Sequence, residues 1–164
     1  MKLTDFLIFC EGFNPKNYAG TPTKKNILQD IAVLFERELR AKYPEKNFPT
    51  VDTIAEALIK RENLVTTGVG YGVALPTGRV KRLPITRFGI YKTPSIDWAS
   101  MDGKPVDIIV PTIGPHDRTG RSLDIVPYLS YLMHERKSKE GILKATNPLE
   151  MDMKTLTSIL TLEN

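Results

Sequence analysis

The sequence predicts a β-sheet with helices packed on it, in a domain of the α/β or α+β class. Three observations indicate this fold class. Apolar residues recur at helical spacing between residues 24 and 59. From residue 65 to residue 113 the chain is rich in β-branched and aromatic residues and is interrupted by Gly and Pro, as strands and turns are. After Pro115 the helical spacing returns.

Two helices are expected in the first third of the chain. The first starts at Lys24 and ends before Pro44, with a buried face made of Ile27, Ile31, Leu34, Phe35 and Leu39. The second follows Thr50, which has the side chain of an N-cap residue. Its buried stripe is expected to contain Val51, Ile54, Ala55, Leu58 and Ile59.

The strands expected in the middle of the chain are residues 73–75, 84–92 and 105–113. The last of these is apolar enough to lie centrally in the sheet, with both faces covered. Residues 101–104 read as a turn. Further helices are expected at residues 123–133, where Pro127 disturbs the pattern, and at 137–145 and 150–160.

Length and composition indicate one globular domain over residues 1–164, with 41% hydrophobic and 26% charged residues. No stretch approaches the roughly 20 apolar residues of a membrane helix, and the short apolar run at residues 6–10 lacks the features of a signal peptide. Cys10 is the single cysteine, which favours a buried thiol in a reducing compartment. We therefore expect a cytoplasmic protein that does not bind a membrane.

The net charge is +4, and part of the excess is concentrated in one segment. Residues 78–92 contain no acid and five basic side chains, namely Arg79, Lys81, Arg82, Arg87 and Lys92. Such a patch suits phosphate, nucleic acid or an acidic protein face, and a solvated basic rim is the simpler interpretation. The aromatic residues within 87–92 fit either a strand that stacks on RNA bases or a strand with a buried face.

Glycine and histidine patterns exclude several common sites. The segment GVGYG at residues 68–72 leads into a strand and has no following Lys-Ser/Thr, so it is neither a dinucleotide loop nor a P-loop, and a tight loop with positive φ is expected. His116 and His134 have no metal-ligand spacing. A hydrolytic triad of His116, Ser122 and Asp124 is disfavoured, because one short segment rarely brings three such groups together. No metal or cofactor is expected.

Residues 50–127 together resemble the IIA domains of the sugar phosphotransferase system, in the fructose–mannitol and nitrogen-regulatory class. Residues 61–80 read RENLVTTGVGYGVALPTGRV, close to a family segment with the pattern TGIGxGIAIPHG. Residues 96–99 (IDWA) and 102–107 (DGKPVD) match a second family segment. Because the opening MKLTD and the closing helices also fit, the resemblance covers nearly the whole chain. It implies an α/β fold with a central mixed β-sheet flanked by helices on both faces.

The resemblance also identifies two departures. In the family, the histidine of Pro-His-Gly accepts phosphate, and here that position is Thr77. A second histidine supports the first, and its position here is Ser122. Imidazole is a nucleophile that passes phosphate onward readily, whereas a threonine hydroxyl needs a positioned base and forms a stable ester. The resemblance with these departures implies that the chain has left the phosphate relay.

The site implied by the resemblance contains Arg61, Thr67, Tyr71, Thr77, Arg79, Arg121 and Ser122. It is expected to bind an anion, unless Arg61 and Arg79 simply pair with surface acids such as Glu62. The leading hypothesis is a regulator that binds a protein partner, either a component of the phosphotransferase system or a regulated enzyme or transporter. The alternatives are a working phosphocarrier with His116 or Thr77 as acceptor, and an anion- or RNA-binding module that uses residues 79–92, although nucleic acid is not the expected partner.

Overall fold

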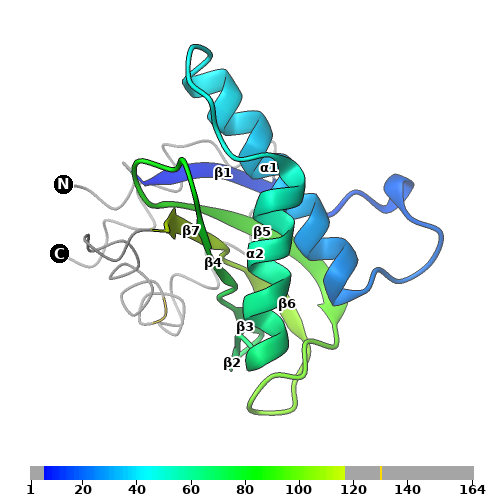
Figure 1. Cartoon of the computed structure of the whole chain (residues 1–164). Helices are drawn as coiled ribbons and strands as arrows, with labels where there is room; N and C mark the ends of the chain where they lie inside the picture. Colours follow the sequence, from blue (N-terminus) through cyan, green and yellow to red (C-terminus); the bar gives the residue numbers. More distant parts are fainter. Residues whose placement is uncertain (1–5, 117–129, 131–164) are drawn as a thin grey trace, which may run out of the picture.

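A computed structural model of the chain describes residues 6–116 and residue 130. In this part of the chain, two long helices lie side by side on one face of a seven-stranded mixed sheet (Figure 1). The mixed sheet with packed helices confirms the fold class. The helices expected after Pro115 lie outside the described residues, so the expected helices on the second face are not described.

The first helix, α1, spans Lys24–Lys42, and the second, α2, spans Val51–Leu64. The Thr23 hydroxyl accepts a hydrogen bond from the Asn26 amide at 3.1 Å, and the Asn26 side chain accepts one in return from the Thr23 amide. Thr50 caps α2 as expected, accepting from the Thr53 amide at 3.2 Å. The predicted inner face of α1 is fully confirmed, since Ile27, Ile31, Leu34, Phe35 and Leu39 are all buried.

The strands are β1 (Leu7–Gly12), β2 (Gly68–Gly70), β3 (Val73–Ala74), β4 (Thr77–Val80), β5 (Arg87–Ile96), β6 (Val106–Ile109) and β7 (Thr112–Pro115), and Pro15–Asn17 form a short 3-10 turn. The longest strand, β5, pairs in parallel with β1 and antiparallel with both β6 and β7. β6 and β7 pair in parallel with β3 and β4, respectively, and β2 pairs antiparallel with β3.

The expected single strand at 105–113 is wrong in one respect, because β6 and β7 are separated by Val110 and Pro111. A matching break at Leu75 and Pro76 separates β3 from β4, beside it in the sheet. Proline has no amide hydrogen for the ladder, so each proline interrupts its strand. The two breaks remain in register, since the Val110 amide donates to Ala74 and the Thr112 amide donates to the Pro76 carbonyl, each at 2.9 Å. The predicted central place of this segment is confirmed.

The glycine segment at 68–72 is partly strand and partly turn. Gly68–Gly70 form β2 rather than a loop, and the expected positive φ angles occur at the following hairpin, with 96° at Gly70, 58° at Tyr71 and 77° at Gly72. The apolar run at residues 6–10 contributes most of β1, a strand that the sequence pattern did not predict.

Candidate functional site

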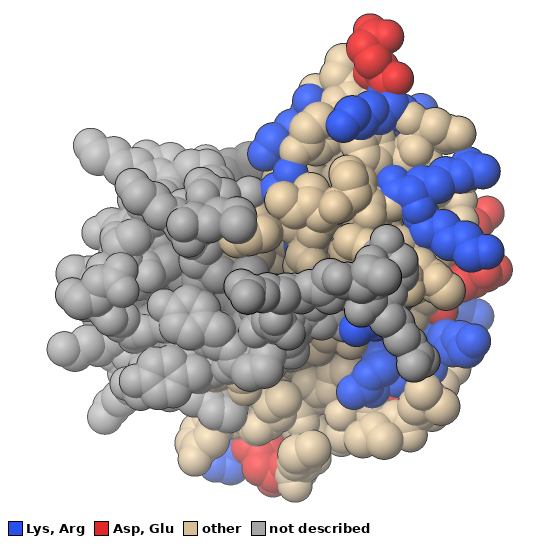
Figure 2. All heavy atoms as spheres, turned by 60° about the vertical axis from the view of Figure 1, so that its left-hand side comes forward, with Lys and Arg blue, Asp and Glu red and all other residues tan. Residues whose placement is uncertain are grey.

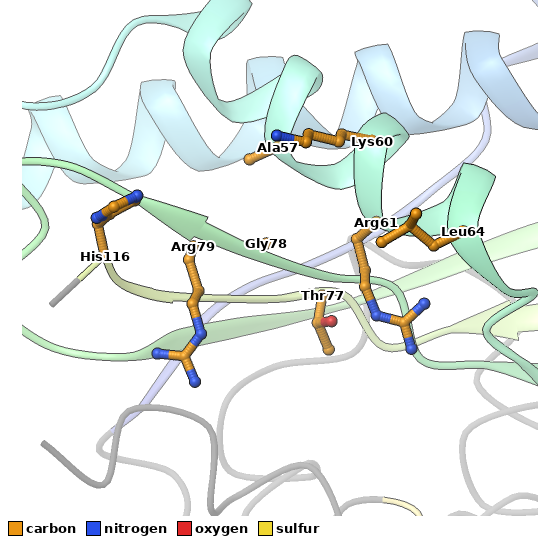
Figure 3. Close-up of a pocket in the computed structure, with 8 residues that line it drawn as sticks. All are labelled: Ala57, Lys60, Arg61, Leu64, Thr77, Gly78, Arg79 and His116. Atoms are coloured by element: carbon orange, nitrogen blue, oxygen red, sulfur yellow. The ribbon is translucent and has the colours of Figure 1, made fainter. Parts of the chain in front are cut away.

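A pocket of about 390 Å³ opens between α2 and β4 (Figure 3). One face of α2, the first three residues of β4 and the residue that follows β7 supply its walls. The lining residues are Ala57, Lys60, Arg61, Leu64, Thr77, Gly78, Arg79 and His116. This volume falls in the range of small-molecule sites, roughly 300–1,000 Å³.

Helical spacing places four α2 residues on the pocket. Ala57, Lys60, Arg61 and Leu64 stand at positions i, i+3, i+4 and i+7, which share one face of a helix. Among these, the resemblance pointed only to Arg61. The other three were missed, although the same spacing applied to Arg61 identifies them.

Gly78 determines how closely α2 approaches β4. A Cβ atom at this position would lie 3.2 Å from the Ala57 Cβ and 3.3 Å from the Leu58 backbone nitrogen. Because those contacts are tight, a larger residue at position 78 would push α2 away from the sheet. The narrow spacing brings the cations of α2 and the side chains of β4 to one opening.

Among the described residues that line the pocket, three are cationic and none is acidic. The Arg61 guanidinium donates to the Val65 carbonyl at 2.9 Å, at the C-terminus of α2, where a cation is favoured. The Arg79 guanidinium donates to the Pro115 carbonyl at 3.4 Å. With Lys60, these groups give the pocket a positive potential that suits an anion.

Glu62, the acid named as an example of a surface partner for Arg61 and Arg79, does not have that role. Glu62 is only 6% exposed and faces away from the solvent. Its carboxylate pairs with the Lys24 ammonium at 2.9 Å and accepts a hydrogen bond from the Thr67 amide at 3.0 Å.

Thr77 and His116 lie at different places along the pocket (Figure 3). In the parallel pair of β4 and β7, Thr77 stands beside Thr112, and Val80 stands beside Pro115. His116 follows Pro115, so it is offset from Thr77 by four residues, about 13 Å along the sheet. The imidazole is therefore not in position to take the proton from the Thr77 hydroxyl.

Two of the predicted site residues are not in this pocket. Thr67 is 5% exposed, and its hydroxyl donates to Glu62 and accepts from the Trp98 indole at 3.3 Å. Tyr71 is 68% exposed at the tip of the β2–β3 hairpin, where its amide donates to Asp102 at 3.0 Å. Arg121 and Ser122 lie outside the described residues. The structure therefore brings Arg61, Thr77 and Arg79 together, with His116 at one end.

The basic and aromatic residues of β5 are largely internal. Phe88 is fully buried, and Tyr91 is 3% exposed, so neither ring is available to stack on a base. Arg87 is also buried, and its guanidinium lies against the ring of Tyr43. The exposed part of the predicted basic segment is therefore Arg79, Lys81 and Arg82.

Cys10, on β1, is half-buried. Its burial raises the pKa of the thiol to about 11, against a smaller lowering by the charge of Lys92. The thiol is therefore protonated near neutral pH, in agreement with a packing role rather than a reactive one.

Two further searches concern the described residues alone. Residues 6–116 contain no group of His, Cys, Asp and Glu that could hold a metal ion. In the same part of the chain, neither helix is long and apolar enough to cross a membrane.

A protein-family model matches most of the chain. The family model described as phosphoenolpyruvate-dependent sugar phosphotransferase system, EIIA 2, matches residues 20–154. The chain belongs to this EIIA 2 family. The resemblance inferred from the sequence is thereby confirmed.

Relatives of this EIIA 2 chain include nitrogen regulatory proteins. That of Bradyrhizobium diazoefficiens is 34% identical over 116 residues, which cover 70% of this chain and 70% of the relative. That of Pseudomonas aeruginosa is 30% identical over 125 residues, 75% of this chain and 76% of the relative.

Solved structures show the same fold. The nitrogen regulatory protein IIA-Ntr of Neisseria meningitidis aligns with a TM-score of 0.76 at 23% identity, over 97% of this chain and 99% of that protein. The mannitol IIA protein of Escherichia coli aligns with a TM-score of 0.57 at 14% identity, over 98% and 99% of the two chains. At these identities, the likeness supports the fold of the EIIA 2 chain and nothing finer.

Proposed function

We propose that this EIIA 2 chain is a regulator that binds another protein and does not carry phosphate. The observation that supports the proposal most directly is the place of Thr77. It lies in the cationic pocket between Arg61 and Arg79, at the position that corresponds by motif to the family's phosphoacceptor histidine. The pocket retains groups that hold an anion but has a hydroxyl in place of the nucleophile.

The chemistry of that hydroxyl argues against a relay. Threonine needs a general base within hydrogen-bond reach before it attacks phosphorus. In the described part of the chain, the Thr77 hydroxyl has no hydrogen-bond partner, and His116 is about 13 Å away along the sheet. A phosphate placed on Thr77 would also form an ester too stable to serve as a donor.

A protein partner is favoured by the surface around the pocket. Leu64, which lines the pocket, is 74% exposed, and its neighbour Val65 is 58% exposed. An apolar centre with cations at its rim is a common composition for a docking surface. The mannitol IIA protein of Escherichia coli has been solved in a complex with phosphorylated IIB of the mannitol system. We propose that this chain likewise docks a protein, a phosphotransferase component or a regulated enzyme or transporter, in the cytoplasm.

A second candidate function rests on His116. This imidazole lines the same pocket as Arg79, so a carrier that uses it as the phosphoacceptor has both a nucleophile and a nearby cation. The product would be an acid-labile phosphoramidate, which can pass phosphate onward.

Intact-mass spectrometry separates the two candidates. The natural protein, Thr77→His and His116→Ala are each incubated with phosphoenolpyruvate, enzyme I and the histidine-containing phosphocarrier. The regulator predicts no added phosphate on the natural protein and phosphorylation of Thr77→His. An acid-labile phosphate on the natural protein that is lost in His116→Ala would overturn the regulator and establish the carrier.

The partner is tested by affinity capture. Leu64→Asp is compared with the natural protein, because a charge in the apolar centre should abolish specific capture. Val33→Asp serves as the matched control, since Val33 is 49% exposed on α1 and lies outside the pocket. Equal recovery of the same proteins by Leu64→Asp would contradict the proposed docking surface.

A further inference from the structure

A second hollow, of about 270 Å³, adjoins the pocket between α2 and β4. Its walls are the turn after β4 and the end of β7, with the lining residues Lys81, Arg82, Leu83, Pro115 and His116. His116 belongs to both linings, so the two hollows meet at this imidazole.

Backbone contacts hold in place the turn and the strand ends that carry the cations of the second hollow. The His116 amide donates to the Val80 carbonyl at 3.1 Å, which ties the end of β7 to the end of β4. Arg82 follows in the left-handed region, with a φ of 65°. That conformation is less favourable for a residue with a side chain than for glycine. The turn nevertheless has an arginine there, and both Arg82 and Lys81 are exposed.

Among the described residues, both hollows are lined by cations and by no Asp or Glu. The cations are Lys60, Arg61, Arg79, Lys81 and Arg82. On α1, the exposed Arg37 and Arg40 pair with glutamates. Lys60, Lys81 and Arg82 form no ion pair with the described residues. On the face that Figure 2 shows, Lys and Arg side chains gather in patches, with acidic side chains in smaller groups.

We propose that the two hollows form one site for a small molecule that carries two separate phosphate groups. One phosphate lies over Thr77 against Lys60 and Arg61, and the other lies against Lys81, Arg82 and His116, with Arg79 between them. Thr77 and the turn after Val80 are three to four residues apart on β4, so the two phosphates are about 10 Å apart. Arginine forks and lysine ammonium groups are the usual partners of phosphate.

The same observations disfavour nucleic acid as the occupant. Binding of single strands combines a basic groove with exposed aromatic rings on which bases stack. The aromatic side chains of the adjacent β5, Phe88 and Tyr91, are buried. The two adjoining hollows, with Leu64 and Leu83 as apolar wall, together have the size of a small-molecule site and fit a compact ligand better. The inference goes beyond the proposed function, because the ligand binds with no protein partner present.

Isothermal titration with two alkanediol bisphosphates tests this site. Hexanediol bisphosphate and ethanediol bisphosphate have the same charge but differ in reach. The longer molecule should bind about tenfold more tightly or better, because only it engages both hollows. Equal affinities would show that the surface binds both molecules through charge alone and would overturn the inference. Binding of RNA without binding of either bisphosphate would overturn it as well.

Single variants locate the two ends of the ligand. Arg61→Ala and Arg82→Ala should each weaken hexanediol bisphosphate about tenfold by removing a charge-assisted contact. Lys46→Ala is the control, since this exposed lysine lies outside both hollows and should leave the affinity unchanged. Unchanged affinity in Arg82→Ala, with a melting temperature equal to that of the natural protein, would contradict the two-ended site. Because no partner protein is added, these results are independent of the docking experiment.

Discussion

The Glu62 carboxylate accepts a hydrogen bond from the Thr67 amide at 3.0 Å, in the interior where α2 ends and the chain enters β2. The same carboxylate binds the Lys24 ammonium at 2.9 Å, and that ammonium lies 5.2 Å from the centre of the Trp98 ring. One buried acid thus joins the start of α1, the end of α2 and the entry to β2. The contact therefore fixes the C-terminal end of α2, next to Arg61.

Replacing Glu62 should therefore destabilise the fold. Glu62→Ala leaves the Thr67 amide and the Lys24 ammonium without their partner, so we expect the free energy of unfolding to fall by about 2–4 kcal/mol. Urea denaturation followed by circular dichroism measures it. Glu56→Ala, an exposed position on the same helix, is the control and should change stability by less than about 0.5 kcal/mol. Equally small effects of both variants would show that the Glu62 contacts make no net contribution to the free energy of unfolding.

Gly89 on β5 should tolerate no side chain. A Cβ atom there would overlap the Phe9 ring, which packs edge-on against Phe35 with the ring centres 4.9 Å apart. We expect Gly89→Ala to lower the melting temperature markedly, with a loss of about 1–3 kcal/mol from overpacking.

A second replacement tests that cause. Phe9→Leu makes room for the added methyl group. The double variant with Gly89→Ala should therefore lose less free energy of unfolding than the two single variants lose together. Gly103→Ala separates sterics from backbone strain, because its added Cβ meets open space at a φ of 70° and should cost only about 1 kcal/mol. Strict additivity of Gly89→Ala and Phe9→Leu would exclude the clash as the cause.

Cys10 should be slow to alkylate in the folded protein. Burial raises its pKa from 9.0 to about 11, which lowers the thiolate fraction near pH 8. We expect iodoacetamide to modify Cys10 at least about tenfold more slowly in buffer than in denaturant, as followed by mass spectrometry. Comparable rates in the two conditions would mean that the thiol is neither shielded nor raised in pKa.

Stability should decline in strong alkali because of two tyrosines near Asp30. Burial raises the pKa of both Tyr18 and Tyr91 well above the usual 10.0, and the Asp30 carboxylate adds to both shifts. A pKa raised by folding means that the stabilisation is complete below pH 10 and is lost as the pH rises through the folded value. We expect the free energy of unfolding to fall by about 1 kcal/mol or more between pH 9 and pH 11.

The phenol of Tyr18 can be tested alone. Tyr18→Phe removes one of the titrating groups together with its hydrogen bond to Asp30. The variant should be less stable at pH 9 but lose less stability on going to pH 11. An unchanged pH dependence in this variant would exclude Tyr18 as a source of the effect.

The amphipathic helices were predictable because the interactions that form them join residues close in sequence. The apolar spacing of α1 and the cap at Thr50 depend on neighbours within one or two turns, and both are as expected. The break in the strand at 105–113 was missed, because an apolar run does not reveal that Pro111 faces Pro76 across two parallel strands. β1 was missed for the same reason, since its pairing with β5 joins segments about 80 residues apart.

The candidate site was predictable where motif and chemistry coincide. Thr77, Arg61 and Arg79 were identified from the family pattern, and they share one pocket. Thr67 was assigned to the same site but lies in the core, where its hydroxyl donates to the buried Glu62 carboxylate. The motif does not reveal that Glu62 is buried. Lys81 and Arg82 were identified only as members of the basic segment 79–92, and Lys60 was not identified at all, since exposed basic residues look alike in a sequence.

The sequence by itself determined the family, the class of fold and the helices α1 and α2, because each depends on a local pattern or motif. Only the tertiary structure decided which charges face solvent and which face one another. Glu62 and Arg87 are internal, whereas His116 joins two cationic hollows. Burial and convergence arise from contacts between distant segments, and a side chain's chemical type does not specify those contacts.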